Sequence, residues 1–428
     1  MKTICLYTAQ LHLAGGIESV VRDLYTILPM GGIHVVAACE YGKADWIADS
    51  DYLCLKDVNR ETAWQEFIAK NRVDVVVFNY TARAYEREVI RDITLIQSLG
   101  VPCVKMIHSS FPSSLLLSGD ERDIRDIGNI ARHCKAVFTV SQIDAKFWTA
   151  LGHKAICIQN PIHVPKKNAD MSRQDGREPG VTNLVWVGRQ CEQKQPSTAL
   201  AAFAQACIKT DKARLTMIGG SEKGWKPLEK EAKRLGVADK VKFLAARSDI
   251  TDIWNMADVH LLTSITESFC LVLAEAKSMG IPTIMFDLPY LELTASGKGL
   301  VVLPQGDIKG MTDAIVRLVE DKALCKKLGR EARESLANFN HEKVISDWHR
   351  ALDALVSGEG FAEVSEDAHI IAAQLAFAWN RYCDKNLWLV RMEENARRFK
   401  VTFRYSARLL FGVVNLARKI RSVASSGK

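Results

Sequence analysis

Two glutamates, Glu267 and Glu275, stand eight positions apart where an apolar strand is expected to lead into a helix. Thr266 or Ser268 is expected to cap that helix, and Gly280 suits its C-terminal end. Glu275 would then lie two turns inside the helix among apolar residues, where a carboxylate is costly unless a partner hydrogen-bonds to it. Hydroxyl groups of a bound ligand could be that partner.

A second interpretation of the pair is that both glutamates are surface residues beside an ordinary helix. The context favours the first, because the free N–H groups and the dipole at a helix start attract an anion. The same junction could therefore hold a negatively charged ligand.

Two cations, Arg189 and Lys194, follow the predicted strand 184–187 and precede a helix expected from Pro196. Ligands of open α/β sheets bind at this end of the strands. An arginine offers a fork for diphosphate oxygens and a lysine offers a point charge, and both would stabilise a departing diphosphate. The alternative is that they are solvated loop cations.

The first half of the chain offers weaker signals. Gly15 and Gly16 follow the first predicted strand and enter a helix, so the backbone could approach a ligand there. His108 ends a later strand and could reach the same edge, although turn glycines need no ligand and a lone histidine is more often structural.

Several chemistries are disfavoured. Neither a G-x-G-x-x-G fingerprint nor a P-loop is present, which argues against a dehydrogenase or an NTPase. The triplet Asp49-Ser50-Asp51 is interpreted as surface turn chemistry rather than a metal site. The 11 cysteines are scattered without zinc spacing, which indicates reduced thiols in the cytoplasm. No metal and no resident cofactor are expected.

The elements that must position these residues form two βαβ cycles. Short apolar runs alternate with amphipathic stretches, which predicts an α/β protein with parallel sheets wrapped by helices. The predicted parts are a first doubly wound domain over 1–165, a linker over 166–181, a second doubly wound domain over 182–357 and a helical extension over 361–428. Two Rossmann-like domains are expected to face a cleft.

Charge is concentrated at the C-terminus. Residues 381–428 hold 12 Lys/Arg against 3 Asp/Glu, a net charge of +9. Because the whole chain has a formal net charge of +7, the residues before 381 carry −2. Nucleic-acid binding by the main body is therefore not expected. Basic and aromatic residues mixed in this tail suit an anionic membrane surface, and the alternative is packing on the first domain or on a second subunit. No run is long enough to span a membrane.

Taken together, these residues resemble the retaining GT-B glycosyltransferases of the family 4 type, from Lys2 to about Leu355. Three matches carry the resemblance: the Gly15-Gly16-Ile17-Glu18 loop, the Gly188-Arg189 to Lys194 segment, and the Glu267 to Glu275 segment closing at Gly280-Ile281-Pro282. Cys270 departs from the pattern, because the family usually has glycine at that place.

The resemblance implies a role for each residue. Arg189 and Lys194 would hold the donor diphosphate, Glu275 the ribose hydroxyls, and Glu267 the transferred sugar. His108 would line the sugar and acceptor pocket. The remaining donor-binding residues would be Gly15 and Gly16 from the first domain, Arg247 near the base, and the helix-start residues Ser268, Phe269, Cys270 and Leu271.

The function that the resemblance implies is transfer of a sugar from a nucleotide donor, with UDP expected, to a polysaccharide or a lipid-linked glycan of the bacterial envelope or capsule. The enzyme would be cytoplasmic and peripheral on the inner face of the cell membrane. Two alternatives stay open: a nucleotide-sugar epimerase of the same architecture, and a non-catalytic partner subunit of a transferase.

Overall fold

The computed structural model describes residues 2–12, 15–79, 86–109, 128–162, 178–247, 249–288 and 291–363. They belong to one compact unit that runs from Met1 to Ser365. The predicted linker 166–181 and the predicted extension 361–428 lie mostly outside the described residues. No helix within the described ranges combines the length and the apolar character that a bilayer crossing requires.

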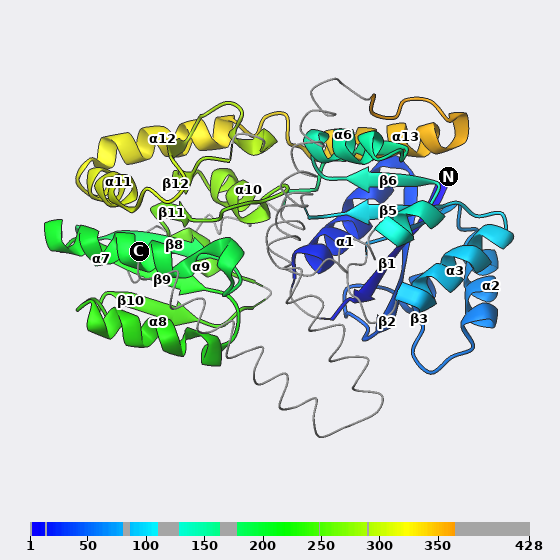
Figure 1. The fold of residues 1–428 in the computed structure, drawn as a ribbon, viewed down its shortest axis with the longest axis horizontal. Coiled ribbons are helices and arrows are strands. Elements are labelled where there is room, and N and C mark those ends of the chain that lie inside the picture. Colours follow the sequence, from blue (N-terminus) through cyan, green and yellow to red (C-terminus); the bar gives the residue numbers. More distant parts are fainter. Residues whose placement is uncertain are drawn as a thin grey trace, which may run out of the picture. The chain divides into compact units, whose positions relative to one another are not determined.

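The first half forms a parallel sheet of seven strands in the order β3-β2-β1-β4-β5-β6-β7 (Figure 1). Its central strands are almost wholly buried and apolar, as expected of a parallel sheet covered on both faces. The strands are β1 (Lys2–Gln10), β2 (Ile33–Tyr41), β3 (Tyr52–Cys54), β4 (Val75–Phe78), β5 (Cys103–Ile107), β6 (Ala136–Thr139) and β7 (Ala155–Cys157). The helices are α1 (Gly16–Ile27), α2 (Arg60–Asn71), α3 (Glu86–Ser98) and α6 (Gln142–Ala150).

The second half repeats the plan with six parallel strands in the order β10-β9-β8-β11-β12-β13. The strands are β8 (Thr182–Val187), β9 (Ala213–Ile218), β10 (Val241–Leu244), β11 (Val259–Leu262), β12 (Thr283–Phe286) and β13 (Leu300–Leu303). The helices are α7 (Pro196–Lys209), α8 (Glu222–Arg234), α9 (Thr251–Met256), α10 (Leu271–Ser278), α11 (Ile308–Glu320), α12 (Lys322–Glu334) and α13 (His341–Ser357).

In both sheets the strand order reverses beside the first strand: strands added early extend the sheet to one side and later strands extend it to the other. In the second sheet β8 lies between β9 and β11, so the loops that leave β8 and β11 diverge to opposite faces. Such switch points open a crevice beyond the carboxyl ends of the strands. The segments after β8 and β11 are those that carry the predicted cations and glutamates.

The last helix of the second half packs on the first half. Trp348 of α13 is 1% exposed and meets Phe138 of β6 edge-on, with ring centroids 6.0 Å apart. Asp347 accepts a hydrogen bond from the backbone of Gln159, and His349 is hydrogen-bonded to the carbonyl of Gly31 at 2.9 Å. The predicted 182–357 domain therefore ends in a helix whose partners lie in the 1–165 domain.

Candidate donor site

A cavity of about 510 Å³ is lined by residues of both halves. The second half contributes the ends of β8 and β9, the loop after β10 and the start of α10, and the first half contributes the start of α1 and the loop after β2. Six predicted site residues line the cavity: Gly15, Gly16, Arg189, Arg247, Leu271 and Glu275. The structure thus brings together residues that are far apart in the sequence.

The loop after β8 is tied to the loop after β11. Gln193 donates to the carbonyl of Thr266 at 2.8 Å, and its own carbonyl accepts from the amide of Ile265 at 2.9 Å. Thr263 donates to the carbonyl of Lys194 at 2.7 Å. These contacts fix the cation-bearing loop against the glutamate-bearing loop, and sequence analysis did not single out Gln193 or Thr263.

Lys194 and Glu267 form an ion pair with each other. The Lys194 Nζ lies 2.5 Å from Oε1 of Glu267, and their side chains are 14% and 7% exposed. Burial works to lower the pKa of Lys194, but the nearby Glu267 carboxylate more than offsets this, so that the pKa is raised and the lysine stays charged. Neither residue is part of the cavity lining.

Of the two predicted cations that follow β8, Arg189 is the one that lines the cavity. Its side chain is exposed and donates to Oε1 of Gln193 at 3.1 Å. No acidic side chain is recorded within ion-pair distance of Arg189 among the described residues. The guanidinium can therefore offer its remaining donors to an anion in the cavity.

Glu275 lines the same cavity from α10. Its Oε2 accepts a hydrogen bond of 3.0 Å from Nε1 of Trp254. Burial raises the pKa of Glu275 to about 7, although the Trp254 hydrogen bond acts in the opposite direction. Near neutral pH the group is present in both its ionised and its protonated form, and the ionised form is a strong acceptor for hydroxyl donors.

The start of α10 differs from the sequence prediction. Neither Thr266 nor Ser268 caps the helix, because Cys270 is the N-cap and makes no side-chain cap hydrogen bond. The hydroxyl of Ser268 instead donates to the carbonyl of His108, which joins the two halves. Since α10 begins at Leu271, Glu275 lies one turn inside the helix rather than two.

Cys270 occupies the left-handed region with φ of 67°. That conformation favours glycine, which is the residue usual at this place in the family that the sequence resembles. The side chains of Cys270 and Phe269 are 5% and 4% exposed and belong to the apolar core. Only their backbone amides could meet a ligand, whereas Leu271 and Val272 line the cavity at the helix start.

The C-terminal end of α10 agrees with the prediction. Gly280 has φ of 69°, and the amides of Gly280 and Ile281 bond back to the carbonyls of Lys277 and Ala276. This is the expected glycine-terminated helix end.

Two glycines after β9 allow a close backbone approach that sequence analysis missed. Gly219 has φ of 141°, and a Cβ at that position would lie 1.8 Å from the carbonyl oxygen of Gly188. Gln190 fills the space beside Gly220 and donates to the carbonyls of Gly219 and Ser221 at 3.3 and 3.0 Å. This part of the cavity lining is therefore backbone of Gly188, Gly219 and Gly220, and Gln190 holds it in place.

The first half brings the start of α1 to the start of α10. A Cβ at Gly16 would lie 3.7 Å from Cδ1 of Leu271, and one at Gly15 would lie 2.1 Å from a carboxylate oxygen of Glu18. Burial raises the pKa of Glu18. Glu18 folds over Gly15 and also lines the cavity.

His108 lies at the end of β5, as predicted, but outside the cavity lining. Its Nε2 is 2.8 Å from Oδ1 of Asn79, whose amide nitrogen donates to the carbonyls of Val77 and Tyr7. Asn79 Oδ1 is thus the acceptor, so Nε2 carries the proton and Nδ1 is left as an acceptor. Burial lowers the pKa of His108 to about 3, and the imidazole is neutral.

Arg247 lines the cavity and is exposed, in an ion pair with Asp252. Asp49 and Asp51 form a surface 3₁₀ turn, in which Asp51 accepts from the hydroxyl of Tyr25 at 2.8 Å. Within the described ranges, no three histidine, cysteine, aspartate or glutamate residues cluster as a metal site would require. The ten described cysteines are free thiols.

The two sheets, their switch points and the shared cavity define a protein of the GT-B glycosyltransferase fold. Solved structures agree: Anabaena HepE in complex with UDP and glucose has a TM-score of 0.67 at 18% identity, over 82% of this chain and 99% of that one. The lipopolysaccharide glycosyltransferase WaaG has a TM-score of 0.63 at 15% identity, over 83% and 100%. Residues 169–335 match the family model described as Glycosyl transferases group 1.

Curated relatives match part of the chain. An exopolysaccharide phosphotransferase of Streptomyces coelicolor is 29% identical over 177 residues, which is 41% of this chain and 19% of that protein. N-acetyl-alpha-D-glucosaminyl L-malate synthase of Bacillus anthracis is 27% identical over 193 residues, or 45% and 50%. The chain therefore spans half or less of the length of these two relatives. Phosphatidyl-myo-inositol mannosyltransferase of Mycobacterium leprae is 25% identical over 272 residues, or 62% and 70%.

Proposed function

We propose that the protein is a glycosyltransferase that takes a sugar from a nucleotide donor, with UDP as the expected nucleotide. The observation that carries the proposal is the shared cavity, in which Arg189, Glu275 and the start of α10 converge. A cation and a helix start suit a diphosphate, and a carboxyl group suits a ribose. The similarity to a HepE structure that contains UDP supports the choice of nucleotide.

In this proposal, Arg189 and the amides of Leu271 and Val272 bind the diphosphate as it leaves. Preorganised donors aimed at developing charge are usually the largest contribution to catalysis. Because the cation, the helix start and the ribose acceptor come from the second half, that half holds the donor. The start of α1 closes the cavity from the other side, where Gly16 lets the chain pass beside Leu271.

The Lys194–Glu267 pair supports the sugar end of the site. Glu267 would contact the transferred sugar, and Lys194 would hold Glu267 in place while adding positive charge near the diphosphate. His108 is neutral, so it would serve the sugar as a hydrogen-bond partner and not as a proton donor. Retention of configuration, with the leaving phosphate taking the proton of the incoming hydroxyl and no resident metal, is part of the proposal.

The proposed acceptor is a polysaccharide or lipid-linked glycan of the cell envelope, and residues 381–428 would bind the inner face of an anionic membrane. The excess of basic residues in this segment motivates the membrane proposal. Flotation with phosphatidylglycerol vesicles tests it. The full chain should float, and a chain ending at residue 360 should not; equal flotation of both would contradict the proposal.

Thermal unfolding against a panel of UDP, GDP, ADP and their sugar conjugates tests the function. A ligand at 100 times its Kd should raise the free energy of unfolding by about 2.7 kcal/mol, and UDP should do so. The conjugate that stabilises most is then assayed for transfer. Arg189→Ala should slow transfer by about 100-fold. If no nucleotide stabilises the protein, the proposal is wrong.

A further inference from the structure

Behind Glu275 lies a tryptophan that sequence analysis did not single out. Trp254 of α9 is 2% exposed, and its Nε1 donates to Oε2 of Glu275 at 3.0 Å. Glu275 itself is only partly buried, because it lines the cavity. One carboxylate oxygen is therefore bound from within the protein, and the group still faces the cavity.

The indole is held by its own neighbours. It meets the ring of His260 edge-on, with ring centroids 5.4 Å apart, and His260 is 0% exposed. Nδ1 of His260 is 3.2 Å from the hydroxyl of Thr283. Ile253, Ala276 and Met279 complete the apolar cluster around Trp254. The hydrogen bond to Glu275 is thus preset by packing and does not depend on a ligand.

A carboxylate has about four acceptor positions on two oxygens. The indole N–H takes one position on Oε2, which restrains rotation of the group and leaves Oε1 for donors in the cavity. Two adjacent hydroxyl groups on one sugar ring present two donors in a fixed geometry. A fixed carboxylate suits such a pair better than one that can rotate, because less freedom is lost on binding.

We propose that Trp254 is a positioning residue that holds Glu275 for the 2′- and 3′-hydroxyl groups of a ribose, and so makes the site selective for ribonucleotides over 2′-deoxyribonucleotides. This inference rests on the proposed function, because it requires a nucleoside diphosphate in the cavity. Trp254 does not touch the ligand and acts only through Glu275.

The charged surroundings of Glu275 bear on its ionisation. Arg22 and Asp23 of α1 face it from the first half, and Arg189 and Arg247 line the same cavity. Burial raises the pKa of Glu275 to about 7, and the Trp254 hydrogen bond lowers it. Without the indole N–H the pKa would rise further, so that less of the carboxyl group is ionised at neutral pH.

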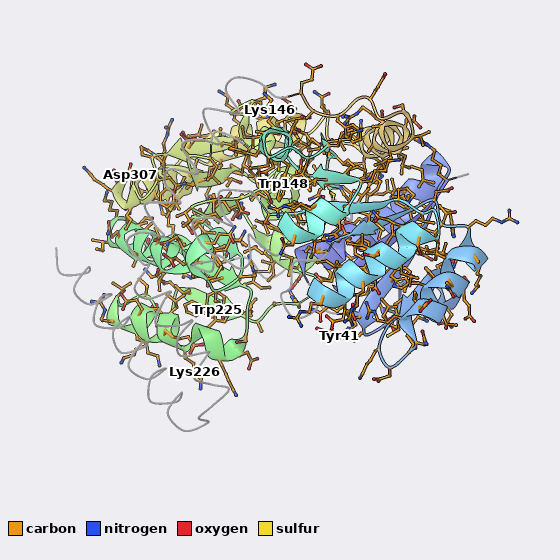
Figure 2. The ribbon with its side chains drawn as sticks, turned by 45° about the vertical axis from the view of Figure 1, so that its right-hand side comes forward. Tyr41, Lys146, Trp148, Trp225, Lys226 and Asp307 are labelled. Atoms are coloured by element: carbon orange, nitrogen blue, oxygen red, sulfur yellow. The ribbon has the colours of Figure 1, made fainter. Side chains whose placement is uncertain are left out.

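The test compares Trp254→Phe with Trp225→Phe. Trp225 is a matched control in the same half, because it is 1% exposed and donates Nε1 to the carbonyl of Leu244 at 2.8 Å, away from the cavity lining. Figure 2 labels Trp225 beside its exposed neighbour Lys226 on α8. Both variants lose one indole hydrogen bond and keep an aromatic ring.

Titration calorimetry with UDP and 2′-deoxy-UDP measures the selectivity at several pH values. At pH 7, Trp254→Phe should weaken UDP binding by about 10-fold, the loss expected for a hydrogen bond to a charged group. Binding of 2′-deoxy-UDP should weaken less, so the preference for UDP shrinks. The loss of UDP affinity in Trp254→Phe, compared with Trp225→Phe, should become smaller as the pH rises to 9, because Glu275 is then ionised again. Trp225→Phe should keep the wild-type preference.

A double-mutant cycle separates positioning from general damage. If Trp254 acts through Glu275, adding Trp254→Phe to Glu275→Gln should change the Kd for UDP by less than about 2-fold. The inference would be overturned if the double variant raised the Kd for UDP by the product of the two single-variant factors. It would also be overturned if Trp254→Phe kept the wild-type preference for UDP. Either result would leave the proposed function standing. A wild-type protein that binds neither UDP nor 2′-deoxy-UDP would overturn both.

Discussion

Glu267 and Glu275 differ in what surrounds them, although eight positions separate them and one loop and helix carry both. Glu267 is held by the ammonium of Lys194 in an ion pair that is mostly buried. Glu275 has an uncharged indole as its hydrogen-bond partner and a pKa raised by burial to about 7. The same residue type thus has a cationic partner at one position and an uncharged partner at the other.

The difference shows that partners and burial assign roles that spacing alone cannot. A cation within contact favours the ionised form of a carboxyl group, whereas desolvation favours the neutral form. The sequence motif places both carboxyl groups correctly along the chain. Lys194 and Trp254, which decide the two environments, come from the segment after β8 and from α9.

The largest expected effect follows from breaking the ion pair. Lys194→Met removes the ammonium group that lies against the buried carboxylate of Glu267, and it also removes positive charge near the proposed diphosphate. We expect sugar transfer to fall by about 100-fold or more and the free energy of unfolding to fall by about 1–3 kcal/mol. Steady-state transfer rates and urea unfolding measure the two effects.

Two variants control this experiment. Lys194→Met combined with Glu267→Gln should recover stability without recovering transfer, because no unpaired charge then remains. Lys209→Met breaks a surface pair with Asp313 of the same 2.5 Å length, whose side chains are 49% and 52% exposed, and should change neither quantity measurably. Normal transfer by Lys194→Met would end the proposed role of the pair.

A smaller effect is expected from the pH dependence of Glu275. Its folded pKa of about 7 lies above the ordinary value of 4.5, so its contribution to stability is fully present below pH 4.5 and is lost as the pH rises through 7. The wild-type protein should lose about 2 kcal/mol relative to Glu275→Gln between pH 5 and pH 8. Urea unfolding of both proteins measures the difference. Parallel stability curves would show that Glu275 has an ordinary pKa.

The smallest effect concerns Cys270, which lies between the two glutamates and turns the chain into α10. Its left-handed backbone costs about 1 kcal/mol or more for a residue other than glycine. Cys270→Gly relieves that strain but loses a buried thiol, so its stability should stay within about 1 kcal/mol of the wild type. Cys270→Ala loses the thiol and keeps the strain. It should therefore be the less stable of the two in urea unfolding, and the reverse order would argue against strain at this position.

Much of the fold was predictable because apolar runs and helical patterns alternate regularly. The sequence pattern predicts strands over 241–244, 259–262 and 283–286, and the structure has β10, β11 and β12 at these ranges. Strands β3 and β7 were not predicted, since each has only three residues and carries too little pattern to detect. The GT-B fold and the group 1 glycosyltransferase segment are confirmed by the comparisons.

The site was predictable only in part. Arg189, Glu275 and Gly16 meet in one cavity, as a switch-point site requires. The roles of these residues toward a ligand stay predictions. Two side-chain pairs could not be predicted, because their contact depends on packing between distant segments. Lys194 and Glu267 are 73 positions apart, and Trp254 and Glu275 are 21 positions apart. The hydroxyl of Ser268 was wrongly assigned to a helix cap because a partner from the other half competes for it.

The return of α13 to the first half means that the peptide chain crosses between the halves twice. Trp348 and His349 anchor the second crossing to the first half. We therefore expect relative motion of the two halves to be a hinge bend rather than a free rotation. In the proposed function, we expect such a bend to admit the donor between α1 and α10 and to release its nucleotide.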